Sequence, residues 1–149
     1  MIISLIILVI VILLLAEIIS YLFHRYLFHR HDVFHCHHHH RHHHLTGDDA
    51  GHDYLIMGIV LLGASLGVII GGYLIGLPFP LVITAIITGY GYYIINWTVH
   101  QWYHSPSEGG KSWLTRYHDY HHRDPTHNYG ILTPLADILG GTFAPPPTN

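Results

Sequence analysis

Three long apolar stretches alternate with polar segments along the chain. The first stretch covers residues 1–23, where only Ser4, Glu17, Ser20 and Tyr21 interrupt the apolar run. Two more stretches follow, over residues 54–77 and 81–97. A helix needs roughly 20 residues to cross the hydrocarbon core of a bilayer, so each stretch is long enough to span it.

The segments between these stretches complete the expected architecture. The sequence from Gly76 to Pro80 contains two prolines and predicts a tight turn, which makes a hairpin of the second and third stretches. We therefore predict an all-α integral membrane protein with three transmembrane helices and a helical, histidine-rich cap. A single domain would cover residues 1–149, with the cap formed by residues 24–53 and 98–149. Glycines at positions 63, 67, 71 and 72 predict close helix packing.

The charged residues indicate which way the helices run. Only 10% of the residues are charged, the net charge is −3, and no Lys/Arg cluster suggests nucleic-acid binding. All six Lys and Arg residues follow the first or the third apolar stretch, and none lies in the turn between the second and third. By the positive-inside rule, the histidine-rich cap is cytosolic and the N-terminus lies outside. The first stretch lacks the basic segment and cleavage site of a signal peptide, so we expect an uncleaved helix.

Histidine is the residue type in clear excess. The chain has 18 histidines, against about three or four expected from ordinary usage. Histidines at i and i+4, or at i, i+3 and i+4, share one helix face, and neutral imidazole is a common ligand of transition metals. Four groups have or approach this spacing: His24 with His29; His40 with His43 and His44; His100 with His104; and His118 with His121 and His122.

Two of these groups leave a question open. His24 and His29 are five residues apart, about 140° around an α-helix, so they share a metal only if the helix ends or distorts between them. The second group has an alternative register of identical spacing, formed by His35, His38 and His39. We prefer the later register because it gives the chain more room to turn back. Cys36, the single cysteine, is interpreted as a bystander.

Ten imidazoles are too many for one ion with four to six ligands, and they suit a pair of metal ions. Glu17 lies on nearly the same helix face as His24, and Asn96 lies one turn before His100, so we expect both to orient ligand imidazoles. Asp124 and Asp137 are equally suited to organising the fold, and His127 is interpreted as a loop residue. The main alternative is a membrane metal-binding or metal-transport protein that loads metal on its His-rich loop.

The histidine groups also carry a family resemblance. Glu17…Tyr21-Leu-Phe-His24-Arg-Tyr-Leu-Phe-His29, His40-Arg-His-His43-His44, His100-Gln-Trp-Tyr-His104-Ser-Pro106 and Tyr117-His118-Asp-Tyr-His121-His122 resemble the histidine boxes of the fatty acid hydroxylase/sterol desaturase superfamily. The segment Asn128-Tyr-Gly-Ile131…Pro134-Leu-Ala-Asp137…Gly141-Thr142 is similar to its C-terminal signature. The wide first box and the Ser-Pro after the third are more like the fatty acid 2-hydroxylase branch.

This resemblance implies a cytosol-facing centre of two iron ions, which zinc may replace on purification. It also implies a membrane-bound enzyme that uses O2 and two external electrons to hydroxylate or desaturate a lipid acyl chain. Cleaving an alkyl C–H bond exceeds what acid–base chemistry of side chains can do, so a redox metal must carry that step. The chain shows no fused electron-donor domain, and we expect a separate electron-donor protein.

The expected topology can be tested with reporter fusions. A reporter placed after Gly76 should lie outside the cytoplasm, and one placed after Asn149 should lie in the cytoplasm, because the basic residues gather on one side of the spans. Alkaline phosphatase and fluorescent-protein fusions measure the two locations. Two fusions reporting the same side would contradict the three-span arrangement.

Overall fold

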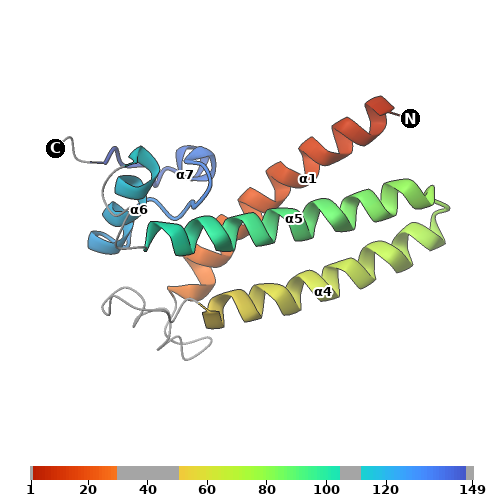
Figure 1. Ribbon diagram of the computed structural model, residues 1–149, viewed down its shortest axis with the longest axis horizontal. Coiled ribbons are helices and arrows are strands. Elements are labelled where there is room, and N and C mark those ends of the chain that lie inside the picture. The colour runs from red at the N-terminus through yellow and green to blue at the C-terminus, as the bar shows by residue number, and fades with distance from the viewer. Residues whose placement is uncertain (1, 30–50, 105–111, 147–149) are drawn as a thin grey trace.

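The computed structural model describes residues 2–29, 51–104 and 112–146, and these residues contain helices and no strand. The helices are α1 (Ile2–Phe23), the π-helical turn η1 (His24–Phe28), α4 (Gly51–Leu74), α5 (Phe79–Tyr103), α6 (Trp113–Arg123) and α7 (Leu135–Gly140). Figure 1 shows α1, α4 and α5 as long rods side by side, with α6 and α7 gathered at one end. We call these two helices and the loops around them the cap.

The three long helices confirm the expected spans. The segments Ile2–Phe28, Tyr54–Leu74 and Phe79–Tyr103 are long and apolar enough to cross a membrane. Most of their large apolar side chains point outward, as in Ile59, which is 62% exposed, and Ile87, which is 65% exposed. Such a surface suits lipid rather than water. The third span ends six residues later than predicted, so His100 lies inside a regular helix.

The turn between α4 and α5 closes the hairpin as its sequence predicts. Gly76 adopts a left-handed conformation (φ 67°), which glycine adopts without steric cost. Its N–H donates to the carbonyl of Tyr73, and the N–H of Leu77 donates to the carbonyl of Gly72. This pairing satisfies the last carbonyls of α4. Pro78 precedes α5, where its missing N–H costs no helical hydrogen bond.

The glycines of α4 play a smaller part than predicted. A Cβ atom at Gly72 would lie 2.8 Å from a methyl group of Val82, so α4 and α5 approach closely there. A Cβ atom at Gly63, Gly67 or Gly71 would meet no neighbour within 4 Å among the described residues. Within the described part of the chain, close packing is therefore seen at Gly72 and not at these three glycines.

A buried aspartate organises the cap. Asp137, which is fully buried, accepts hydrogen bonds from the N–H groups of Tyr129 and Gly130 and from the hydroxyls of Tyr117 and Thr142. A buried carboxylate costs free energy unless it is hydrogen-bonded in this way. Asp137 thus joins α6, α7 and the segment between them, which is the organising role that its place in the sequence suggested.

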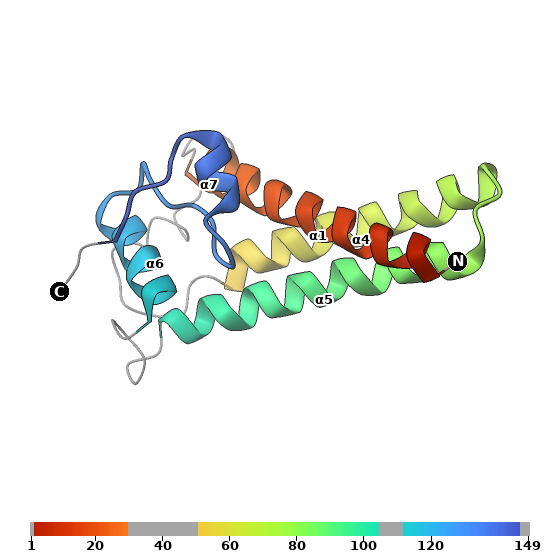
Figure 2. The same cartoon turned by 90° about the horizontal axis from the view of Figure 1, so that it is seen from above.

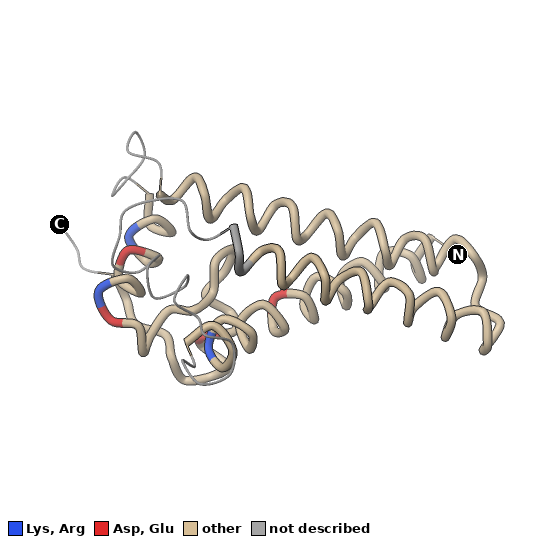
Figure 3. The backbone as a smooth tube through the Cα atoms, turned by 90° about the horizontal axis from the view of Figure 1, so that it is seen from below, with Lys and Arg blue, Asp and Glu red and all other residues tan. Residues whose placement is uncertain are grey.

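The cap is tied to α1, and most of the described charged residues lie at its end of the bundle. The hydroxyl of Tyr21 and that of Thr142 form a hydrogen bond of 3.1 Å. Figure 2 shows α7 beside the last turns of α1, at the end of the bundle opposite the α4–α5 turn. Figure 3 shows the coloured charged positions gathered mainly at this end, with an acidic position farther along the bundle. The described charged residues are therefore concentrated at the end of the bundle where the cap packs on α1.

Candidate metal centre

The π-helical turn resolves the unusual spacing of the first two histidines. A π-helix places hydrogen bonds between residues five apart, so it aligns positions that an α-helix would splay. His24 opens η1 and His29 follows its last residue. Their rings stack with centroids 5.3 Å apart. The helix distortion that shared binding requires is present.

Four imidazoles converge in a first group. His100 lies in α5, His104 follows its last residue, and His118 and His122 lie in α6. His118 Nε2 lies 3.1 Å from His104 Nε2 and 3.0 Å from His122 Nε2. An imidazole nitrogen either donates one proton or offers one lone pair, so hydrogen bonding cannot satisfy both contacts of His118 Nε2. Nitrogens bound to one tetrahedral ion at about 2.0–2.1 Å lie roughly 3.3 Å apart, and these distances fit such an ion.

A second group contains three imidazoles, from His24, His29 and His121. The Nε2 atoms of His29 and His121 are 3.3 Å apart. His24 Nδ1 lies 2.7 Å from the carbonyl of Tyr129, and His121 Nδ1 lies 2.6 Å from the carbonyl of His127. A carbonyl only accepts, so both Nδ1 atoms carry the proton and each Nε2 keeps its lone pair for a ligand bond.

The two groups adjoin each other. The rings of His118 and His121 are 6.1 Å apart, and those of His121 and His122 are 6.0 Å apart. All three histidines project from one face of α6. The residues of the first group all come from the second half of the chain, whereas the second group combines His24 and His29 with His121. Burial and the neighbouring imidazoles lower the pKa of His118 well below its usual value. The neutral ring that results is the form that binds metal.

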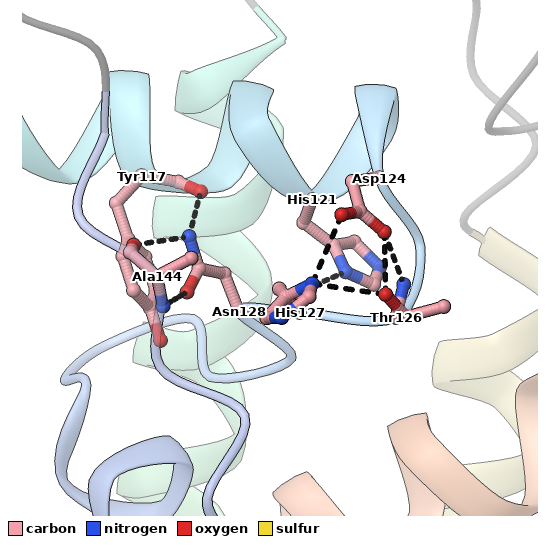
Figure 4. Close-up of polar contacts among 7 residues, drawn as sticks. All are labelled: Tyr117, His121, Asp124, Thr126, His127, Asn128 and Ala144. Carbon is pink, nitrogen blue, oxygen red and sulfur yellow. Dashed lines mark hydrogen bonds and ion pairs between the residues drawn. The ribbon is translucent and has the colours of Figure 1, made fainter.

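The loop after α6 holds the carbonyls that orient the second group. Figure 4 shows Asn128 between α6 and the C-terminal segment. Its side chain donates to the carbonyls of Tyr117 and Ala144 and accepts from the N–H of Ala144. Asn128 is fully buried and has a φ of 58°, a left-handed conformation that asparagine adopts more readily than most residues. It therefore fixes the carbonyls on either side of it, at His127 and Tyr129.

A turn at the C-terminal end of α6 supports the same carbonyls. Asp124 accepts hydrogen bonds from the N–H and hydroxyl of Thr126 and lies 3.0 Å from His127 Nδ1, as Figure 4 shows. The contacts with Thr126 lower the pKa of Asp124. The sequence interpretation treated His127 as a loop residue and missed the role of its backbone. The sequence did contain a hint of this role, because His127 precedes Asn128, a residue type that adopts the left-handed conformation more readily than most.

Glu17 and Asn96 have other partners than the ligand imidazoles. Glu17 accepts hydrogen bonds from the hydroxyl of Tyr92, at 2.7 Å, and from the N–H and hydroxyl of Thr133. Asn96 donates to the same hydroxyl of Tyr92 and accepts from the hydroxyl of Tyr54. The result is a buried chain that links α1, α4, α5 and the cap loop directly beneath the histidines.

A cavity of about 160 Å³ lies among α1, α4 and α5. Two ligand candidates, His24 and His100, form part of its wall at the cap end, and they belong to different histidine groups. Leu61, Ala64 and Gly89 line it farther along the helices, within the membrane-spanning segments. The cavity thus connects the histidine groups with the apolar interior of the bundle.

Seven of the ten expected ligands lie in these two groups. The remaining three, His40, His43 and His44, and the alternative set His35, His38 and His39 fall outside the described residues. Because seven imidazoles already converge, the described part alone has the donor set for two adjacent metal ions.

Comparison with known proteins agrees with this geometry. No curated protein and no solved structure is significantly similar to the chain. The model of the fatty acid hydroxylase family matches residues 9–142, which include most of the first span, the whole of the other two, both histidine groups and the C-terminal segment through Thr142. Such a match covers most of the chain, and it shows that this membrane protein belongs to the fatty acid hydroxylase family.

Proposed function

We propose that this protein is a membrane-bound di-iron oxygenase that hydroxylates, or desaturates, a lipid acyl chain. It would use O2 and electrons from a separate donor protein. The observation that carries the proposal is the cavity, whose wall includes one imidazole from each histidine group and which otherwise runs among lipid-facing helices. A metal store or a metal transporter has no need of an apolar cavity at its histidines.

The dimensions of the cavity suit one acyl chain. Gly89 precedes His100 by eleven residues on α5, a separation of roughly 16 Å along the helix axis. Half of the hydrocarbon core of a bilayer is about 15 Å thick, which is the reach of one acyl chain in its leaflet. A chain lying from the histidines to Gly89 would leave the reacting carbon near its head-group end. This position favours hydroxylation close to the carboxyl carbon, as in the fatty acid 2-hydroxylase branch.

The imidazoles would hold two iron ions, one at each group. His40, His43 and His44 are proposed to complete the ligand set. Bound iron supplies the redox chemistry that C–H oxidation requires, and zinc would bind the same nitrogens without it. The residues of the chain supply the rest: the carbonyls of His127 and Tyr129 hold the protons of two Nδ1 atoms, and the apolar wall keeps water from the chain. We further propose that the cap faces the cytoplasm, where a donor protein can reach it.

Metal content should respond separately to the two groups. His122→Ala removes a ligand from the first group and His121→Ala removes one from the second, and each should lower the bound metal from about two ions per chain to about one. Elemental analysis of the purified protein measures this. Arg123→Ala is the matched control, because Arg123 is exposed on the same helix and belongs to neither histidine group. Unchanged metal content in both His121 and His122 variants would contradict the assignment.

Turnover should depend on iron and oxygen. The iron-loaded protein, given a reductant, O2 and membrane lipids, should add one hydroxyl or one double bond to an acyl chain, which mass spectrometry of the lipids detects. The zinc-loaded protein should keep its helical content and melting temperature but form no product, since zinc offers no redox step. Product formed equally without O2, or with zinc, would contradict an oxygenase.

The depth of the cavity should select the length of the chain. Gly89→Leu places a side chain where a Cβ atom is already 3.4 Å from Leu61, so the far part of the cavity is filled. The longest accepted chains should lose roughly tenfold or more in kcat/KM relative to shorter ones, as expected for lost methylene sites in an apolar pocket. Gly91→Leu is the control on the same helix, because a Cβ atom there meets no described neighbour within 4 Å. Identical chain-length profiles for the two variants would contradict this placement of the chain.

A further inference from the structure

Helix α7 presents an apolar face to its surroundings. Ile138 is 57% exposed and Leu139 is 71% exposed, and Leu135 lies on the same stripe at 39%. These positions are three and four residues apart, so they form one face of the helix. The opposite face carries Ala136 and Asp137, which are buried in the cap. A cap surrounded by water would be expected to have polar residues on its outer face.

The depth of α7 along the bundle explains this face. Gly140, its last residue, packs so closely on α1 that a Cβ atom there would overlap the hydroxyl of Tyr21. Tyr21 precedes Phe28, the end of the first span, by about 10 Å along the helix axis. Figures 1 and 2 agree that α7 lies beside the last turns of α1 rather than beyond its end. The exposed face of α7 is therefore level with the last two turns of a membrane span.

The side chains around α7 form the polar boundary that such a position requires. Arg25 donates to the carbonyl of Gly140 and to the hydroxyl of Tyr21, and its guanidinium lies 5.0 Å from the ring centroid of Tyr26. Arginine and tyrosine side chains have an apolar part and a polar end, and they are typical of the head-group level of a bilayer. Below them, Ile18 and Leu22 of α1 are exposed and continue the apolar surface of α7.

We propose that α7 lies in the membrane surface and inserts Ile138 and Leu139 among the lipid acyl chains just below the head groups. The occupant of this face is the bilayer, because the face is continuous with the lipid-facing surface of α1 and lies at its depth. The proposal does not depend on the chemistry of the metal centre. In this arrangement the membrane holds α7 in place, and Asp137 of α7 in turn accepts hydrogen bonds from the N–H groups of Tyr129 and Gly130.

Fluorescence quenching in vesicles tests this position. Cys36→Ser gives a full-length chain without cysteine, into which Leu139→Cys or Arg123→Cys is introduced and labelled with the dye NBD. Arg123 is the control, because it is exposed on α6, which lies farther from the bundle than α7. In phosphatidylcholine vesicles that carry a spin label on acyl carbon 5, the dye at position 139 should be quenched several-fold more strongly than the dye at 123. Equal quenching at the two positions would overturn the proposal.

A second measurement removes any influence of the dye. Leu139→Glu puts a charge on the inserted face, whereas Arg123→Glu puts the same charge on the outer helix. Hydrogen exchange of the vesicle-bound proteins should be several-fold faster over residues 135–143 in the Leu139 variant alone, because a charge disfavours insertion of α7. Circular dichroism checks that both variants keep their helices. Unchanged exchange over these residues in Leu139→Glu would overturn the proposal.

Discussion

The structure depends on holding two groups of imidazoles, one of four and one of three, at the end of a lipid-facing bundle, with the candidate ligand nitrogens of each group within 4.8 Å of one another. One hydrogen bond cannot satisfy both neighbours of a nitrogen such as His118 Nε2, so the surrounding backbone must hold the rings in place. Two local departures from regular structure do this. The π-helical turn η1 brings His24 and His29 onto one side, and the left-handed Asn128 presents the carbonyls of its two neighbours to His121 and His24.

The bundle supports these groups through a buried polar chain. Glu17 would be costly inside apolar helices on its own, but it accepts hydrogen bonds from Tyr92 of α5 and from Thr133 of the cap loop. Asn96 extends the chain to Tyr54 of α4, whose ring lies 5.7 Å from that of His100. All three spans and the cap therefore meet in one set of hydrogen bonds. The network positions the helices that carry the candidate ligands, while the hydrogen bonds of Glu17 and Asn96 go to Tyr92, Thr133 and Tyr54.

The parts of this fold that follow local rules could be predicted from the sequence. The spans follow from apolar length, the hairpin from Gly76 and its prolines, and the histidine groups from helical spacing. The division of α6 between the two groups could not be predicted, because His118, His121 and His122 share one face and spacing alone does not separate them. Only the position of α1 shows that His121 belongs with His24 and His29. The partners of Glu17 were also out of reach, since Tyr92 and Thr133 are far from it in sequence.

Two histidines of the candidate metal centre also line the cavity. His24 and His100 each face the cavity and belong to a histidine group, so a side chain that reshapes the cavity near them also changes the setting of the ligands. Residues farther along the helices, such as Gly89, touch the cavity without touching either group. If the proposed acyl substrate occupies the cavity, the length of chain that fits can vary deep in the bundle, where helix packing is separable from metal binding. Near the cap, by contrast, the atoms that would bind metal would also limit where the end of that chain lies.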